Sequence, residues 1–418
     1  MLRLNKRSLR ACVGYARCLI MLSKWSVAEK FLRQTLAAHQ NSAEAWYLLG
    51  LARRKLCMYE EANLAFRTAL EIQPNYAAAQ RDHRILHHLR DEPMEKRLEL
   101  YNRMTTICNK IREETSYTYN ILCNDGGGIR GLISAIWTAE IERLTNSSAV
   151  SLFNMMSGTS TGAIVAAGLC APNREHPTLP RYKAADIVKL YVANGNKVFE
   201  KPRGRWWYNF RRAVTQEAKY ISESRHKLFK AYFDHTKLSH MLSELVVPAV
   251  KNDSQITHLF NKYDCRNENA VDYEVHDVLM CTTAAPTYFS PHKLGTCQYV
   301  DGGIQMNNPV MAAYSEALRY DPSRKDRLFV LSLGTGDYVP NPLHPSADRH
   351  LLFYGKHTQE ILNIVVDGPQ YNVDMHMLSV LGKERYQRWQ VWFEEPISLD
   401  AVDKASIDML FDKAREFF

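Results

Sequence analysis

The chain has 418 residues, 46% of them hydrophobic, so its length suits two or three domains that each bury a core. This composition excludes an intrinsically disordered chain and a small disulfide-stapled scaffold. The longest apolar stretch, Gly162 to Pro172, is far shorter than the ~18 to 20 residues of a spanning helix, so we predict no transmembrane segment. We expect no secretory signal either, because Arg17 splits the weakly apolar stretch near the start and no small-residue cleavage site follows it.

Cysteine usage and charge bear on the compartment and the partners. The nine cysteines are scattered and contain no C-x-x-C pair, which favours reduced thiols and a cytoplasmic location. All of the net charge of +8 lies in residues 1–115, which hold 20 Lys+Arg against 12 Asp+Glu. This surplus would suit an anionic membrane, an acidic partner or nucleic acid. Solvated helix faces are the commoner explanation, and we expect no nucleic-acid partner.

A repeat with a period of 34 residues runs from residue 9 to residue 76. The period aligns apolar residues of matching size, such as Ala28 with Ala62 and Leu36 with Leu70. The second unit resembles the tetratricopeptide repeat family, and it matches that consensus at Trp46, Leu49, Gly50, Ala62, Phe66, Ala69 and Pro74. The resemblance implies pairs of packed helices that could bind a protein partner.

The sequence predicts three successive regions. Residues 1–92 would form the helical repeat module, with Ala77 to Leu89 as a capping helix, and residues 93–115 a connector helix. Residues 116–418 would form an α/β domain with a mostly parallel sheet flanked by helices, because short β-rich runs alternate there with helical patterns. The expected strands are Tyr117–Cys123, Ser151–Met156, Thr257–Phe260, Gln298–Val300 and Leu328–Leu333, and the expected helices are Ile129–Leu144, Ser160–Leu169, Pro309–Arg319 and Asp400–Phe417.

The sequence Gly158-Thr159-Ser160-Thr161-Gly162 is a G-x-S-x-G motif between a predicted strand and a predicted helix. That context is the one a nucleophile elbow requires. The glycines Gly158 and Gly162 would permit a sharp turn that exposes the Ser160 hydroxyl at the positive end of the following helix. A loop of small residues without chemistry is the competing interpretation.

A second strand-to-helix junction carries Asp125 followed by Gly126, Gly127 and Gly128. Backbone N–H groups that three successive glycines leave uncovered can form an oxyanion hole. The spacing through Gly131 also fits a dinucleotide-binding loop. That site needs an acidic residue about 20 positions later, and none occurs from residue 143 to residue 174.

A serine nucleophile needs a base, and Asp301 in an Asp-Gly-Gly sequence after a predicted strand offers one. Five motifs then occur in the order and rough spacing of the patatin-like phospholipases: D-G-G-G-I-R-G at 125–131, G-T-S-T-G at 158–162, A-A-P-T-Y-F at 284–289, D-G-G with N-N-P at 301–309 and L-S-L-G-T-G at 331–336. The chain resembles this family closely over residues 117–340 and loosely beyond.

The resemblance implies a Ser-Asp dyad, with Ser160 as nucleophile and Asp301 as base. It assigns the oxyanion hole to Gly126, Gly127 and Gly128, with Arg130 nearby for a phosphate or for loop order. We expect Asp125 to cap the loop's N–H groups. The alternative is a triad that includes one of the histidines after Asp301, which are His344, His350, His357 and His376.

The implied activity is that of a serine lipid acyl hydrolase of the phospholipase A type, acting on membrane phospholipid or another acyl lipid. The alternative is a helical-repeat scaffold whose second domain binds lipid without turnover. We expect no cofactor and no metal, because no calcium loop occurs and a backbone oxyanion hole needs no Lewis acid. The pair His83 and His87, at i, i+4 spacing, lacks further ligands for zinc.

The segment from Lys201 to Arg212 mixes four aromatic side chains with five cations. Amphipathic rings suit the headgroup boundary of a bilayer and basic side chains suit anionic lipid. We therefore predict peripheral membrane contact through this segment; the competing interpretation is a cap that packs on the sheet. The predicted membrane-binding residues are Trp206, Trp207, Arg211 and Arg212.

Overall fold

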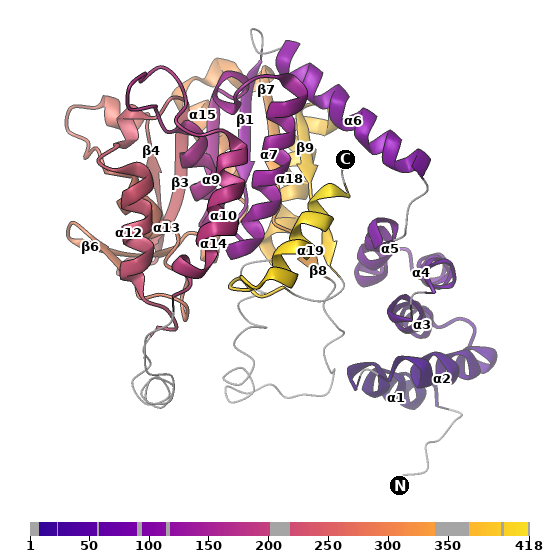
Figure 1. Cartoon of the computed structure of the whole chain (residues 1–418). Helices are drawn as coiled ribbons and strands as arrows, with labels where there is room; N and C mark the ends of the chain where they lie inside the picture. The colour runs from indigo at the N-terminus through magenta and orange to yellow at the C-terminus, as the bar shows by residue number, and fades with distance from the viewer. Residues whose placement is uncertain are drawn as a thin grey trace. The chain divides into compact units, whose positions relative to one another are not determined.

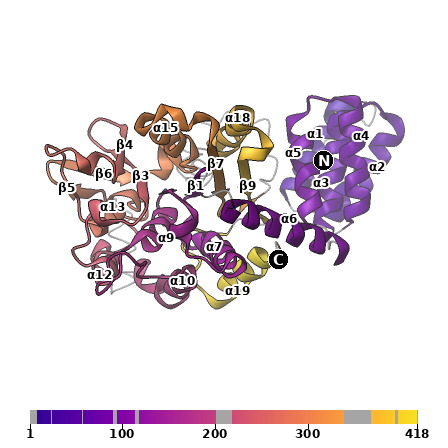
Figure 2. The same ribbon diagram turned by 90° about the horizontal axis from the view of Figure 1, so that it is seen from above.

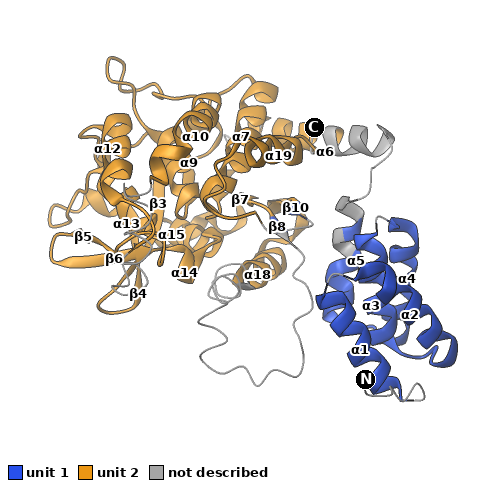
Figure 3. Cartoon of the chain, turned by 60° about the horizontal axis from the view of Figure 1, so that its bottom comes forward, with its two compact units in different colours: residues 1–93, 337–356, 392–396 blue, residues 94–336, 357–391, 397–418 orange. Residues whose placement is uncertain are grey.

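The computed structural model describes residues 8–22, 24–56, 58–89, 94–113, 118–200, 218–338, 368–393 and 397–416. The chain divides into two compact units, shown in blue and orange in Figure 3. The first unit comprises residues 1–93, 337–356 and 392–396, and the second comprises residues 94–336, 357–391 and 397–418. Every helix within these described ranges is too short or too polar to cross a bilayer.

The first unit is built from packed helix pairs. At the crossing of α3 and α4, a Cβ atom on Gly50 would lie 2.4 Å from the ring of Phe66, so the consensus glycine is needed for close approach. The small residues Ala28 and Ala62, one period apart, are both fully buried. The elements of this unit are α1 (Leu9–Met21), α2 (Trp25–Ala38), α3 (Ala43–Lys55), α4 (Tyr59–Ile72), α5 (Ala77–Leu89) and the short parallel pair β8 (Asp337–Tyr338) and β10 (Trp392–Phe393). The predicted repeat helices and the helix at Ala77 to Leu89 are therefore observed.

The second unit is organised around an eight-stranded sheet in the order β5-β6-β3-β2-β1-β7-β9, with β4 paired to β3 (Figure 1). The strands β3, β2, β1, β7 and β9 run parallel, whereas β4, β5 and β6 join by antiparallel pairing. This confirms the expected mostly parallel sheet. The strands are β1 (Tyr119–Asn124), β2 (Met155–Gly158), β3 (Glu244–Lys251), β4 (Ile256–Asn261), β5 (His292–Leu294), β6 (Cys297–Asp301), β7 (Leu328–Leu333) and β9 (Tyr386–Trp389).

Helices cover both faces of this sheet. Figure 2 shows α15 and α18 on one face and α7, α9 and α10 on the other. One core forms where Ile121 and Val330 of the central strands pack with Val310 and Ala313 of α15 and with Met377 of α18. The helices are α6 (Met94–Glu113), α7 (Leu132–Thr145), α8 (Ala149–Leu152), α9 (Thr161–Cys170), α10 (Ala184–Val198), α12 (Ser222–Phe233), α13 (Val275–Thr282), α14 (Gly303–Met306), α15 (Val310–Tyr320), α18 (Gly368–Arg385) and α19 (Lys404–Arg415), and the short 3₁₀ turns are Gly128–Gly131, Leu238–His240, Asp264–Arg266 and Pro322–Asp326.

One predicted strand differs from the structure. Residues 151–156 contain the end of α8 and the start of β2, not a continuous strand. Short apolar runs fit a buried helix as well as a strand, so periodicity could not separate the two. In the structure the strand begins only at Met155, where the parallel pairing of β2 with Ile121 of β1 starts.

Candidate active site

Ser160 stands at the turn between β2 and α9 with a backbone φ of 51° and ψ of −120°. This is a left-handed conformation that L residues rarely adopt, and it projects the side chain out of the turn. The flanking glycines are required by close packing. A Cβ on Gly158 would lie 2.2 Å from the carbonyl oxygen of Gly162, and a Cβ on Gly162 would lie 2.1 Å from that of Asn124. The G-x-S-x-G sequence therefore forms the predicted strained elbow.

Hydrogen bonds from distant segments hold this elbow. The Ser160 N–H donates to Thr282 Oγ1 at 3.0 Å, and the Thr282 hydroxyl donates in turn to the carbonyl of Pro248 at 2.6 Å. The Thr159 hydroxyl donates to the Met306 carbonyl at 2.6 Å. The strained conformation is thus fixed by β3, α13 and α14, none of which is close to it in sequence.

Asp301, the last residue of β6, faces the serine. The Ser160 hydroxyl donates to Asp301 Oδ2 at 2.6 Å, and the Gly303 N–H donates to Oδ1 at 2.7 Å. The aspartate is buried, with 5% of its surface exposed. The fold therefore brings together the two residues that the sequence motifs singled out 141 positions apart.

The histidines considered for a triad are not part of this arrangement as described. His376 is exposed on α18. His344, His350 and His357 lie outside the described residues, as does the predicted membrane segment with Trp206, Trp207, Arg211 and Arg212.

Burial changes the pKa of Asp301 in the direction that suits a general base. Desolvation raises the pKa of Asp301 to about 6, and the hydrogen bonds from Ser160 and Gly303 and the positive charge of Arg225 counteract part of that rise. A carboxylate with this pKa is ionised at neutral pH and still takes up a proton more readily than an exposed aspartate.

We expect the rate of ester hydrolysis to rise with pH through an inflection near 6. Asp301 must be ionised to accept a proton, so kcat/KM should fall about tenfold per pH unit below that point. The profile of a soluble short-chain ester between about pH 5 and pH 8 measures this. Arg225→Met should move the inflection to higher pH, because the charge of Arg225 lowers the pKa of Asp301. A flat profile, or an unmoved inflection in the variant, would contradict the assignment.

The glycine loop presents two uncommitted N–H groups beside the serine. The Gly126 N–H donates to the Asn307 carbonyl at 3.0 Å and is already engaged. The N–H groups of Gly127 and Gly128 have no acceptor in the described part of the chain, and both residues line the same pocket as Ser160. Gly128 has a φ of +58°, and a Cβ there would lie 2.3 Å from the Leu399 carbonyl oxygen. The geometry thus favours Gly127 and Gly128 over Gly126 as oxyanion donors.

Two charged residues at the glycine loop, Arg130 and Asp125, form polar contacts that order it. Arg130 is buried and donates to the carbonyls of Gly127, at 3.4 Å, and Gly336, at 3.3 Å, which favours loop order over phosphate binding. The Asp125 carboxylate, which we expected to cap the loop, forms a buried ion pair with Arg388 of β9, at 3.0 and 2.5 Å. Arg388 belongs to no motif that the sequence displays.

An apolar pocket of about 110 Å³ opens beside Ser160. Its walls come mainly from α9, α10, α12 and the segment 283–289, with apolar side chains from Ile129, Ile164, Leu190, Val198, Phe199, Phe229, Pro286, Phe289 and Leu399. The shape and lining suit a hydrocarbon chain whose carboxyl end meets the serine.

Arg225 is an unexpected member of this pocket, and no sequence motif marked it. It is fully buried, donates to the Thr283 carbonyl and stacks on Phe289, with its guanidinium carbon 3.8 Å from the ring centroid. Desolvation lowers its pKa to about 9. Its Nε and Nη2 atoms have no hydrogen-bond partner among the described residues, so the group acts on Asp301 mainly through its charge.

Comparison with known proteins agrees with the motifs. Residues 122–314 match the family model for patatin-like phospholipase, and residues 43–76 match the model for the tetratricopeptide repeat. Patatin-like proteins 3 and 2 of Arabidopsis thaliana are 29% and 31% identical over 249 and 247 residues. Each match covers 52% of this chain and 58% or 60% of the relative, so the chain spans about three fifths of their length.

A third relative from the same plant bears the name probable inactive patatin-like protein 9. It is 29% identical over 285 residues, which cover 62% of this chain and 71% of that protein. Sequence similarity to patatin-like proteins therefore does not by itself imply turnover, and the residues of the site are the relevant observation.

Proposed function

We propose that this chain, which carries a patatin-like phospholipase domain and a tetratricopeptide repeat, is a serine lipid acyl hydrolase of the phospholipase A type. The observation that carries the proposal is the 2.6 Å hydrogen bond from the Ser160 hydroxyl to the buried carboxylate of Asp301. It lies beside an apolar pocket and two unengaged backbone N–H groups. Nucleophile, base, oxyanion donors and acyl site would thus converge on one point.

In the proposed reaction, Ser160 Oγ bonds to the ester carbonyl carbon while its proton passes to Asp301. The oxyanion that forms accepts hydrogen bonds from the N–H groups of Gly127 and Gly128. Collapse breaks the bond to the leaving alcohol, which takes the proton from Asp301, and an acyl-enzyme remains. Water then gives its proton to Asp301 and attacks the acyl carbon, and the carboxylic acid leaves as Ser160 regains its proton.

The pocket and the sequence support a proposed substrate class. The apolar lining suits a fatty-acyl chain, so membrane phospholipid or another acyl lipid is the proposed substrate. Such a substrate must be drawn from a bilayer, and the proposal includes a cytoplasmic protein in peripheral contact with membrane. Trp206, Trp207, Arg211 and Arg212 are the proposed contacts, on the sequence argument alone.

Labelling with a fluorophosphonate probe, combined with a lipid panel analysed by mass spectrometry, tests the proposal. We expect one covalent adduct on Ser160 and release of free fatty acid from at least one diacyl lipid. A chain that binds lipid vesicles but takes up no probe and releases no acid would instead be a scaffold with a non-catalytic lipid-binding domain.

The acyl pocket allows a separate prediction about chain length. Val198→Trp should fill the pocket and lower kcat/KM for a long-chain ester about tenfold more than for a short-chain ester. The matched control is Val192→Trp, on the exposed face of the same helix α10 and outside the pocket. The ratio of the two rates in each variant is the measurement. An equal loss on both esters would show that the acyl chain binds elsewhere.

A further inference from the structure

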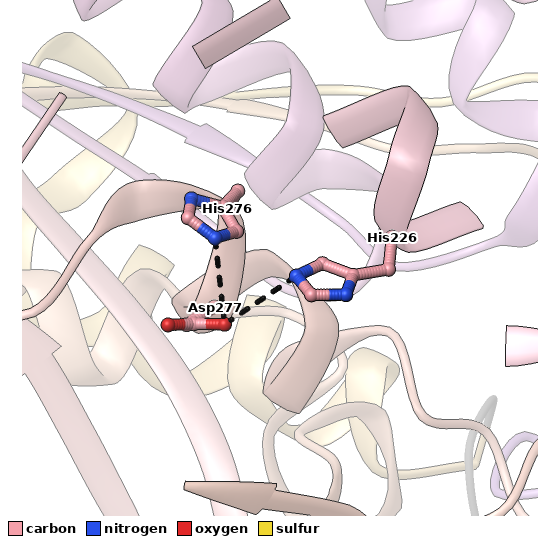
Figure 4. Close-up of side chains that lie close together, drawn as sticks. All are labelled: His226, His276 and Asp277. Atoms are coloured by element: carbon pink, nitrogen blue, oxygen red, sulfur yellow. Dashed lines mark ion pairs between the residues drawn. The ribbon is translucent and has the colours of Figure 1, made fainter. Parts of the chain in front are cut away.

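Three imidazoles surround one carboxylate oxygen on the side of the second unit that carries α12, α13 and β5. His226 comes from α12, His276 and Asp277 from the start of α13, and His292 from the start of β5. Their Nε2 atoms lie 3.7, 3.6 and 3.7 Å from Asp277 Oδ1. Figure 4 shows the rings of His226 and His276 directed at this oxygen.

Several of these nitrogen atoms lack a hydrogen-bond partner. Nε2 of His226 and Nε2 of His292 are buried, and the described residues offer neither of them a bond of hydrogen-bonding geometry. A buried polar atom without a partner costs free energy and in native proteins usually indicates an unseen water or ion. The ligand atoms of His226, His276 and Asp277 all lie within 4.8 Å of one another, so a single ion could reach all three.

A neighbouring carboxylate approaches a second arrangement typical of metal centres. Glu274 Oε2 lies 3.3 Å from Nδ1 of His276, on the side of the ring away from Asp277 Oδ1, without the geometry of a hydrogen bond. In metal sites the second nitrogen of a ligating histidine commonly meets such a carboxylate, which fixes the ring's orientation.

We propose that His226, His276, His292 and Asp277 form a binding site for a divalent transition metal, with zinc as the best fit. Three imidazole nitrogens and one carboxylate oxygen are ligands that suit zinc, whereas calcium and magnesium prefer oxygen alone. The separations of 3.6 to 3.7 Å between Asp277 Oδ1 and the three Nε2 atoms are slightly longer than the edges of a tetrahedron with ligand bonds of about 2.0 to 2.1 Å. His292 lies outside the group whose ligand atoms are all within 4.8 Å of one another, so the proposal requires its ring to move toward the ion on binding. Four protein ligands make a closed, structural site.

Such a site would brace one wall of the pocket. The segment 283–291 joins α13 to β5 and contributes Pro286 and Phe289 to the pocket lining. A metal held by His276 on one side and His292 on the other would close the base of this segment and join it to α12. No bond made or broken at Ser160 involves the metal, so the proposed chemistry at the dyad stays independent of it.

The test uses the purified full-length chain, stripped with a chelator and then titrated with zinc chloride by calorimetry. We expect one zinc per chain, a rise in melting temperature on addition, and a visible spectrum typical of a tetrahedral site when cobalt replaces zinc. The double variant His226→Gln/His292→Gln should lose the metal. Glu274→Gln keeps all four ligands and should bind zinc about 10- to 100-fold more weakly. His376→Gln, at an exposed position of α18, is the control that retains it.

Two outcomes would overturn the site. The first is no zinc retained by the native chain, in which case the cluster is a carboxylate surrounded by imidazoles and nothing more. The second is equal retention by the double variant, which would place the metal elsewhere. If the double variant does not fold, the cobalt spectrum of the native chain decides, because an octahedral spectrum contradicts a four-ligand site.

Discussion

Replacing Ser160 with Ala should eliminate ester hydrolysis, with kcat at least about 10⁴-fold below that of the native chain. Without Oγ there is no atom to form the acyl-enzyme, and the remaining oxyanion donors act only on attack by water. Alanine has the same Cβ as serine, so the elbow at φ 51° gains no new strain. Turnover of a short-chain ester, probe labelling and the melting temperature are the three measurements.

The matched control is Ser151→Ala, at an exposed position of α8, the helix that precedes β2. It should keep both turnover and labelling. Turnover in Ser160→Ala close to the native rate, in a protein that still melts cooperatively, would remove Ser160 from the mechanism.

Asp301→Asn should lower kcat by about 10² to 10⁴-fold, because an amide cannot take the serine's proton. The amide is nearly isosteric and can still accept the Gly303 N–H, so we expect the fold to persist. Fluorophosphonate labelling of Ser160 should slow in parallel, which separates loss of the base from loss of lipid binding.

Single alanine substitutions at the histidines after Asp301 decide between dyad and triad. The variants are His344→Ala, His350→Ala, His357→Ala and His376→Ala, and each should keep most of the activity. A histidine whose loss costs as much as Asp301→Asn would establish a triad.

Strands that are buried on both faces were the most predictable part of the fold. β7 was predicted at the residues where it occurs and β1 within two residues, because Leu328 to Leu331 and Ile121 to Cys123 form continuous apolar runs. The turns after such strands could also be predicted, since glycine-rich loops there leave few alternatives. The elbow and the glycine loop therefore appear where the sequence placed them.

The strand β3 was missed although it lies near the middle of the sheet. Pro248 interrupts its apolar run, and a proline inside a run argues against a central strand. The structure accommodates this proline between two pairings, since the register with β2 ends at Val246 and the register with β6 begins at Ala249. Pairing partners decide whether the missing N–H matters, and local sequence contains no information about them.

The residues of the site likewise divide into those that the sequence marks and those that it does not. Ser160 and Asp301 could be found because each sits in a local motif. Thr282, Arg225 and Arg388 could not, because each acts through one long-range contact with the elbow, with Asp301 or with Asp125. The imidazole cluster was missed for a similar reason. Sequence spacing can indicate two histidines on one helix, such as His83 and His87. The members of the cluster come instead from α12, α13 and β5.

The pairing of β3 connects the geometry of the candidate active site with the formation of the sheet. Ser160 follows β2, Asp301 ends β6, and both strands pair with β3. Ser157 pairs with Val246 near the start of β3 and Asp301 pairs with Ala249 farther along it, while β4 pairs with the opposite edge. A state in which β2 or β6 is not paired with β3 would hold Ser160 apart from Asp301, and under the proposed mechanism it would be inactive. Reactivity at Ser160 would then report that both strands have paired with β3.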